Sequence, residues 1–252
     1  MTANERRPFV NLGTIVLEPS RWARPKQATY AVADWADRIS DAGFDGIEVW
    51  EQHAIDVLLP LGPPLIYNTY CGFDDESSAE RWMAWQAATG LRARGMKFNV
   101  GGDEERLEEY ARNLHKWIND LPDTCRPLCE CHAGTIVETP RAAHDFFDAA
   151  GVDCGIIVHA FSDTEERLSE WLSLFGPSVE LVHVQLRDDA GRFIRLDEAP
   201  ELAKRRISIL RDAGFTGSYT LEFTKGTGTA DDRPEVLWEH ALSDLAFLRE
   251  HA

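Results

Sequence analysis

The sequence predicts one domain of the α/β class, a (β/α)8 or TIM barrel that spans residues 1–252. Three observations support this prediction. Apolar runs with strand character alternate with helical periodicity, one glycine turn recurs, and the 252-residue length is close to the roughly 250 residues typical of the fold. The eight predicted strands are 10–17, 46–50, 65–70, 97–100, 127–132, 155–161, 181–187 and 218–223.

Segments with helical periodicity lie between and after these strands. Apolar residues recur every three or four positions in 32–39, 107–118, 168–172 and 238–248, so each of these segments would bury one face. The stretch after the second strand, 51–59, is too short for a full helix. The alternation of strands and helices indicates βα units around a parallel sheet.

A repeated turn precedes two of the predicted strands. The run Asp41-Ala-Gly-Phe-Asp-Gly46 recurs as Asp212-Ala-Gly-Phe-Thr-Gly217. In each copy the first glycine follows a predicted helix end, where a left-handed backbone favours glycine. No Gly-x-Gly-x-x-Gly motif follows the first strand, which disfavours a doubly wound dinucleotide-binding fold.

The charge balance disfavours two classes of partner. The chain has 26 Lys and Arg against 43 Asp and Glu, a formal net charge of -17, so its surface should repel nucleic acid and anionic membranes. Apolar runs such as 154–158 are far shorter than the roughly 20 residues of a spanning helix, and the first eight residues lack the apolar core of a secretion signal. The five cysteines match neither a paired framework nor a CxxC zinc pattern. We expect reduced thiols, a cytoplasmic location and a small-molecule substrate.

Polar side chains gather where the predicted strands end, which is the side on which barrel enzymes carry their chemistry. Alternation along the fifth strand puts Leu128, Glu130 and His132 on one face and Cys129 and Cys131 on the other. We expect the polar set to face the barrel axis and the two cysteines to pack as small apolar residues under helices. The same rule turns further residues inward, namely His159 on the sixth strand, His183, Gln185 and Arg187 on the seventh, and Glu222 on the eighth.

Four motifs have a family resemblance. They are Phe-Asp-Gly-Ile-Glu-Val at 44–49, Leu-Cys-Glu-Cys-His-Ala-Gly-Thr at 128–135, Val-His-Val-Gln-Leu-Arg-Asp at 182–188 and Leu-Glu-Phe at 221–223. In order and spacing they resemble the strand motifs of the xylose isomerase-like superfamily of TIM barrels. That superfamily is the sugar phosphate isomerase/epimerase group, which also contains inosose dehydratase and endonuclease IV. The resemblance extends over nearly the whole chain.

The resemblance implies one divalent metal held by a Glu, an Asp, a His and a second Glu. The two Glu ligands fall on Glu130 and Glu222, whereas His159 stands where the family has Asp and Gln185 where it has His. Gln at that place is similar to the 3-dehydroshikimate dehydratase branch. The implied set carries one negative charge fewer than the usual set, which would leave the ion more Lewis-acidic. Its mixed nitrogen and oxygen donors favour Mn, Co, Fe, Ni or Zn over Mg or Ca.

Three of the inward-facing residues, His159, Gln185 and His132, can also be interpreted as structural. His159 is either a ligand or a hydrogen-bonded core histidine. Gln185 is either a ligand or a bridge between strands. His132 is either a catalytic acid or base, or a group that orients a neighbour.

A second group of residues is expected to bind substrate. Arg187 is a candidate clamp for a hydroxyl or carboxylate, unless it pairs with Asp188 or Asp189. Glu48 and His53 follow or end the second strand and are expected to line the pocket. Trp50 offers the flat apolar surface on which sugar rings often stack.

The resemblance implies an enzyme that removes a proton next to the carbonyl of a ketose, an inosose or a related polyhydroxylated ketone. Glu130 and Glu222 would lie on opposite sides of the substrate, one taking a proton and the other returning it, with a metal-stabilised enediolate. An isomerase or epimerase is the first expectation. The alternatives are a dehydratase of the inosose or 3-dehydroshikimate kind and a non-catalytic barrel. Endonuclease-like DNA repair is disfavoured because the chain is acidic.

Overall fold

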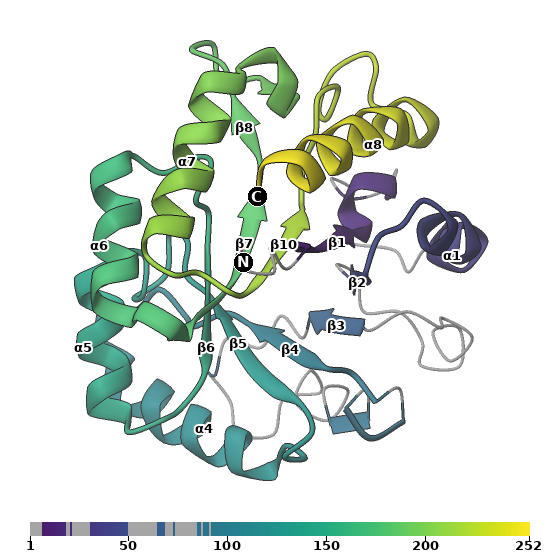
Figure 1. Ribbon diagram of the computed structural model, residues 1–252. Helices are drawn as coiled ribbons and strands as arrows, with labels where there is room; N and C mark the ends of the chain where they lie inside the picture. The colour runs from purple at the N-terminus through teal and green to yellow at the C-terminus, as the bar shows by residue number, and fades with distance from the viewer. Residues whose placement is uncertain are drawn as a thin grey trace, which may run out of the picture.

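A computed structural model describes residues 7–18, 21, 31–49, 65–68, 73, 85, 86, 88–90 and 92–252. Its parallel strands form a closed barrel with the circular order β1-β10-β7-β6-β5-β4-β3-β2 (Figure 1). The predicted (β/α)8 class is confirmed. The barrel strands are β1 (Phe9–Gly13), β2 (Gly46–Val49), β3 (Leu65–Asn68), β4 (Gly95–Phe98), β5 (Arg126–Glu130), β6 (Gly155–Val158), β7 (Val179–Val184) and β10 (Ser218–Leu221).

Helices surround the barrel, as Figure 1 shows for α4 to α8. The α-helices of the described residues are α1 (Ala31–Asp41), α4 (Leu107–Asp120), α5 (Pro140–Ala150), α6 (Glu165–Phe175), α7 (Pro200–Asp212) and α8 (Pro234–His251). Short 3-10 helices are η1 (Thr14–Leu17), η2 (Glu104–Arg106), η3 (Gly176–Ser178) and η4 (Leu196–Glu198). An antiparallel hairpin of β8 (Leu186–Arg187) and β9 (Phe193–Ile194) follows β7. No helix within the described ranges is long and apolar enough to cross a membrane.

Local sequence signals explain several helix ends. At the start of α5, Thr139 accepts a hydrogen bond from the Ala142 N–H and Pro140 takes the first helical position, while Gly151 ends the helix with a φ of 60°. The repeated turn behaves as predicted, because Gly43 and Gly214 have φ values of 88° and 77°. These turns deliver the chain from α1 into β2 and from α7 into β10.

The apolar core has an outer and an inner part. The outer part packs the strands against the helices and includes Trp117 of α4 and Trp171 of α6. Inside the barrel, a smaller cluster joins one residue from each of β3, β5, β6 and β7, namely Ile66, Leu128, Ile157 and Leu181. Side chains alternate along a strand, so the residue two positions later also faces the barrel axis. In all four strands that residue is polar, namely Asn68, Glu130, His159 and His183.

Several strands begin or end away from their predicted positions, and β1 and β4 show why. β1 stops at Gly13, and the apolar residues 14–17 form η1, whose side chains are all buried. A Cβ at Gly13 would lie 2.8 Å from the carbonyl oxygen of Leu221, so β10 approaches too closely for a larger residue. β4 begins at Gly95, two residues before the predicted start, because the missing side chain makes room for Leu128.

The seventh strand is shorter at its C-terminal end than predicted. β7 stops at Val184, and Arg187 belongs to the β8–β9 hairpin. Asp188 stabilises the hairpin turn by accepting hydrogen bonds from the N–H groups of Ala190 and Arg192, both at 2.9 Å. The strands β5, β6 and β10 also end before their predicted limits, at Glu130, Val158 and Leu221.

Candidate metal centre

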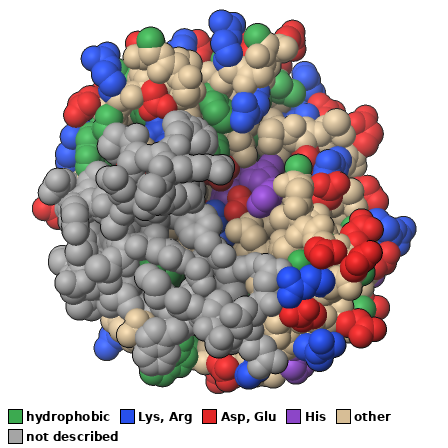
Figure 2. All heavy atoms as spheres, turned by 180° about the vertical axis from the view of Figure 1, so that it is seen from behind, with side chains coloured by type: hydrophobic (Ala, Val, Ile, Leu, Met, Phe, Trp, Pro, Cys, Tyr) green, Lys and Arg blue, Asp and Glu red, His purple; other side chains and the backbone are tan. Residues whose placement is uncertain are grey.

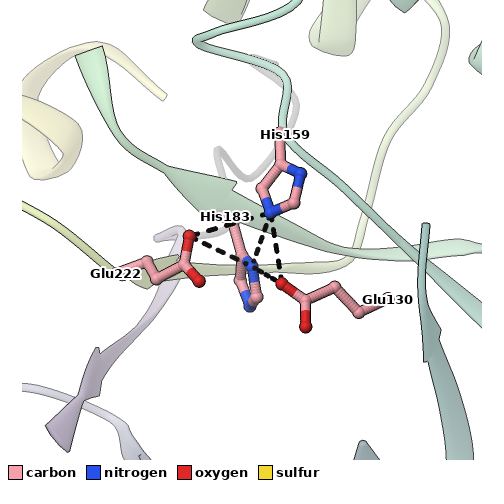
Figure 3. Close-up of side chains that lie close together, drawn as sticks. All are labelled: Glu130, His159, His183 and Glu222. Carbon is pink, nitrogen blue, oxygen red and sulfur yellow. Dashed lines mark hydrogen bonds and ion pairs between the residues drawn. The ribbon is translucent and has the colours of Figure 1, made fainter. Parts of the chain in front are cut away.

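Four side chains from neighbouring strands meet at the C-terminal end of the barrel (Figure 3). Glu130 is the last residue of β5 and His183 lies in β7, while His159 and Glu222 directly follow β6 and β10. One potential ligand atom of each residue lies within 4.8 Å of those of the other three. Because β5, β6, β7 and β10 are neighbours in the barrel, short side chains are sufficient to bring these atoms together.

Backbone contacts hold the residues that follow the strands. The chain bends directly after β6, where the carbonyl oxygen of His159 accepts hydrogen bonds from the N–H groups of Ser162 and Asp163, both at 3.0 Å. The N–H of Glu222 donates to the carbonyl oxygen of Val184 at 3.2 Å. Glu222 is therefore held by β7, and His159 by the turn that follows it.

The distances between the four ligand atoms fit one small divalent ion. Nε2 of His159 lies 3.1 Å from Nδ1 of His183, 3.3 Å from Oε1 of Glu130 and 3.7 Å from Oε2 of Glu222. Nδ1 of His183 lies 3.2 Å from the same Glu130 oxygen and 3.5 Å from the same Glu222 oxygen. Four ligands placed about 2.1 Å from a tetrahedral ion are about 3.4 Å apart. The donors and their spacing therefore fit a metal.

Glu48 orients the His183 ring. Nε2 of His183 lies 3.0 Å and 3.1 Å from the two oxygens of Glu48, so in the neutral ring that would bind a metal the proton lies on Nε2. The lone pair of Nδ1 then points toward the other three groups. A carboxylate on the far ring nitrogen is the arrangement that commonly orients metal-binding histidines. His183 is fully buried and Glu48 is only 3% exposed.

Further contacts distinguish the two oxygens of each acidic ligand. Oε2 of Glu130 lies 3.2 Å from Nζ of Lys97 and accepts a hydrogen bond from Nδ2 of Asn99, also at 3.2 Å. Oε1 of Glu130 is the oxygen that faces the histidines. In Glu222, Oε2 accepts a hydrogen bond from Nε2 of Gln185 at 2.9 Å. Oε1 of Glu222 has no hydrogen-bond donor among the described residues.

Burial and charge act against each other on the ionisable groups. Burial raises the pKa of Glu48, but His183 and Lys97 outweigh it and lower that pKa to about 2. Burial also raises the pKa of Glu130, and Lys97 with the two histidines holds it well below its ordinary value. Burial lowers the pKa of His183, whereas Glu48 and Glu222 raise it to about 10. A metal must therefore compete with a proton for His183.

The cluster contains three of the four predicted ligands. Glu130, His159 and Glu222 converge, and Gln185 reaches the cluster through its hydrogen bond to Glu222. His183 places a ring nitrogen at ligand distance from the same three groups. Alternation along the seventh strand predicted that His183 faces inward, but the family motif directed the ligand role to Gln185.

His132 lies apart from the four converging groups. The prediction placed it on the fifth strand above Glu130, but β5 ends at Glu130 and His132 lies in the following turn. Its Nδ1 is 2.7 Å from the carbonyl oxygen of Ala133. Within the described residues, it makes no hydrogen bond or ion pair with the cluster.

Arg187 is exposed on the β8–β9 hairpin. Its guanidinium carbon lies 3.8 Å from the centre of the Phe193 ring, and Nη1 donates to the carbonyl oxygen of Gly191 at 2.7 Å. It pairs with neither of the two neighbouring aspartates, and Asp188 instead binds Arg192 at 2.7 Å. The Arg187 guanidinium thus lies over an aromatic ring.

The other predicted residues divide into two groups. Trp50 and His53 lie outside the described residues. Cys129 and Cys131 are buried in the outer core, as predicted, and take no part in the cluster. Burial raises the pKa of Cys129 well above its ordinary value, as expected for an unreactive thiol.

Lys97 and Asn99 have no counterpart among the predicted site residues. Both lie on or directly after β4, two positions apart, so both face the barrel axis. The available signal was a lysine inside the run Gly-Met-Lys-Phe, which is buried throughout. A buried lysine requires an acidic partner, and this requirement points toward the barrel interior.

The cluster opens to one end of the barrel. The side chain of His159 is 15% exposed and those of Glu130 and Glu222 are 10% exposed. Figure 2 shows histidine side chains in a hollow, beside acidic and basic groups. A separate cavity of about 610 Å³ lies at the opposite end, among the first residues of strands, such as Phe9, Gly95 and Ser218.

Solved structures with the same architecture include proteins with metals and with enzyme activities. A xylose isomerase-like TIM barrel protein from Mycobacterium smegmatis, in complex with magnesium, is 13% identical over 100% of this chain and 99% of that chain, with a TM-score of 0.59. Endonuclease IV from Thermus thermophilus is 14% identical over 96% and 100% of the two chains, with a TM-score of 0.64. The probable 3-DHS dehydratase AsbF from Bacillus anthracis is 14% identical over 95% and 98%, with a TM-score of 0.62.

This chain shares the TIM barrel fold of these xylose isomerase-like proteins. The resemblance found in the sequence motifs is thereby confirmed for the fold. No family model and no curated sequence matches the chain. In this xylose isomerase-like barrel, the cluster of Glu130, His159, His183 and Glu222 is the group of described residues that could hold a metal.

Proposed function

We propose that the chain is a divalent-metal-dependent isomerase or epimerase of a ketose, an inosose or a related polyhydroxylated ketone. The observation that supports this most directly is the convergence of two carboxylates and two imidazoles at distances suited to one ion. A divalent ion held there would stabilise the negative charge that develops on a substrate oxygen when a neighbouring carbon loses its proton. The mixed nitrogen and oxygen donors favour Mn, Co, Fe, Ni or Zn.

Glu222 is the better candidate for the base that removes the proton. Its Oε2 faces the histidines, and its Oε1 has no hydrogen-bond donor among the described residues. A carboxylate oxygen that is already hydrogen-bonded is a weaker base. The second oxygen of Glu130 is engaged by Lys97 and Asn99. We therefore assign proton removal to Glu222, with Glu130 on the opposite side of the substrate.

Glu48 is assigned to the support of His183. Both its oxygens contact the ring, and one of them also lies 2.9 Å from Nζ of Lys97. With all of these contacts and 3% exposure, Glu48 acts beneath the substrate pocket. Arg187, Trp50 and His53 are the proposed contacts to the substrate. The contact of Arg187 with Phe193 supports a role for Arg187 in binding a planar carboxylate.

A dehydratase is the second candidate, and the position of Gln185 favours it. Its amide donates to the carboxylate that we assign as the base, and Gln at this place resembles the dehydratase branch. Elimination needs the same proton removal and, in addition, an acid that protonates the leaving group. His132 is the proposed acid. His132→Ala should slow a dehydratase by roughly 10²-fold or more, and an isomerase by much less.

The first test is the metal content of protein purified without chelator. We expect about one transition-metal ion per chain. Glu130→Gln, Glu222→Gln and His159→Ala should each lower occupancy sharply, and comparison of His183→Ala with Gln185→Ala identifies the fourth donor. Glu108→Gln, at a side chain that is 96% exposed, is the matched control and should retain the metal. Full metal in the Glu130 and Glu222 variants would refute the site.

The second test is the reaction itself. Metal-loaded protein is incubated in deuterated water with ketoses, inososes, 3-keto sugars and 3-dehydroshikimate. An isomerase or epimerase gives a product of unchanged mass apart from solvent deuterium at the carbon that loses its proton. A dehydratase gives a lighter product with an α,β-unsaturated carbonyl that absorbs in the ultraviolet. Neither signal with any substrate, although metal is bound, would favour a non-catalytic barrel.

A further inference from the structure

Beneath the candidate metal centre, four charged side chains form a closed ring. Nζ of Lys97 lies 3.2 Å from Oε2 of Glu130 and 2.9 Å from Oε1 of Glu48. Glu48 contacts Nε2 of His183 at 3.0 Å, and Nδ1 of His183 returns to Oε1 of Glu130 at 3.2 Å. The ring therefore connects both metal-facing residues of β5 and β7 through partners on β2 and β4.

The ring is almost fully enclosed by the barrel. Lys97 is 2% exposed, Glu48 3%, Glu130 8% and His183 0%. A charge at such a position is tolerated only when partners of opposite charge hold it. The ring therefore has little freedom to rearrange, and each contact fixes the orientation of the next side chain.

One consequence concerns the carboxylate of Glu130. A free carboxylate can bind a metal through one oxygen or through both. In Glu130, Lys97 and Asn99 both engage Oε2, and only Oε1 faces the histidines. Because of the contacts from β4, Oε1 of Glu130 faces the candidate metal position and Oε2 belongs to the ring of charged side chains.

We propose that Lys97, together with Asn99, is a positioning residue that keeps Glu130 a one-oxygen ligand and so leaves a coordination position for the substrate. This inference rests on the proposed function. With one donor atom from each of the four residues, the ion would be four-coordinate and could expand to take a substrate oxygen as its fifth ligand. A Glu130 that bound through both oxygens would occupy the place that a substrate oxygen needs. Lys97 contacts no substrate in this assignment and acts through Glu130.

Cobalt(II) provides a measurement that does not depend on turnover. Its visible absorption is intense in four-coordinate sites and weaker when a fifth ligand binds, so it reports the number of ligands. We expect Lys97→Met to bind Co(II) but to lose roughly half or more of the band intensity, because Glu130 then binds through both oxygens. Glu108→Gln, at a side chain that is 96% exposed, is the control and should retain the wild-type band. Glu48→Gln, measured alone, gives the separate effect of losing the carboxylate that contacts His183.

The double variant Lys97→Met/Glu48→Gln separates positioning from charge balance. It removes one positive and one negative charge, so it should recover the melting temperature that Lys97→Met loses. If Lys97 positions Glu130, the double variant still has the weakened band. A wild-type band in Lys97→Met, or recovery of both band and melting temperature in the double variant, would overturn the inference. Wild-type protein that binds no Co(II) would refute the proposed function and this assignment with it.

Discussion

Asp244 offers a test of how the loops around the site are held. It lies on α8 and is 3% exposed. One oxygen accepts a hydrogen bond from the N–H of Leu196, at the start of η4, and the other accepts from Oγ1 of Thr224, at 2.8 Å and 2.9 Å. Thr224 lies two residues after Glu222. Asp244 therefore ties α8 to the segments that follow the hairpin and β10.

The pKa of Asp244 determines how strongly the free energy of unfolding depends on pH. Burial raises this pKa from its ordinary value of 3.8 to about 7, against the lowering effect of the hydrogen bonds from Leu196 and Thr224. The folded protein thus binds a proton that the unfolded chain releases, and the stability this proton contributes is present below about pH 4 and lost as the pH rises through 7. At 1.36 kcal/mol per pH unit, the loss approaches about 4 kcal/mol.

Asp244→Asn should remove this pH dependence. The amide can still accept from the Leu196 N–H and can donate to Oγ1 of Thr224. We expect the variant to exceed the wild type in free energy of unfolding by about 4 kcal/mol at pH 8 and by about 2 kcal/mol at pH 5. Urea denaturation at the two pH values measures the difference.

Asp145→Asn provides the control for this measurement, because its side chain is 68% exposed. The control should show no comparable change in stability between pH 5 and pH 8. An Asp244→Asn advantage that is equal at both pH values, or larger at pH 5, would refute the reasoning. It would mean that the two hydrogen bonds keep Asp244 ionised across this range.

Two further predictions concern the site and its partners. His159→Asp should keep the metal, since Asp is the ligand that the resemblance implies, but should lower turnover because the added negative charge makes the ion less Lewis-acidic. A substantial gain in turnover would contradict this argument about Lewis acidity. Unchanged metal content and unchanged activity would show that His159 is a core histidine and not a ligand. The chain should show no appreciable affinity for duplex or abasic DNA at physiological salt, given its net charge of -17. Fluorescence anisotropy with labelled DNA measures this, and binding that weakens steeply with added salt would contradict it.

The barrel was predictable because local and periodic signals agree. The glycine turns before β2 and β10 have the left-handed backbone expected from the repeat. The prediction that residues 14–17 continue the first strand was wrong, because a buried helix and a buried strand have the same apolar composition. These residues are buried in a 3-10 helix. The strand ends where β10 closely approaches Gly13. This contact is between segments far apart in the sequence, so no local pattern predicts it.

The candidate ligands were predictable where side chains keep the two-residue alternation of their strand. Leu128 and Glu130 follow the two-residue alternation of β5, and Glu130 faces inward as expected. The seventh strand ends at Val184. Gln185 still points to the cluster, where it donates to Glu222, whereas Arg187 is exposed on the hairpin. The hairpin turn that Asp188 stabilises redirects Arg187 onto Phe193. His159 and Glu222 also lie beyond their strands and still join the cluster, so the course of the chain after each strand decides which inward residues converge.

Lys97 was missed because of the predicted start of the fourth strand. With a start at residue 97, the lysine would lie at the N-terminal end of the barrel, away from any chemistry. The strand begins at Gly95, which pairs with Arg126. Lys97 therefore pairs with Leu128, two residues further from the N-terminal end of the barrel. From there its amine reaches Glu48 and Glu130. Glycine is a poor strand former, so the sequence does not indicate that the strand starts there. Glycine is required at position 95 because a Cβ would lie 2.8 Å from the Leu128 side chain. A packing requirement between two strands thus sets the register that brings the lysine to the candidate metal centre.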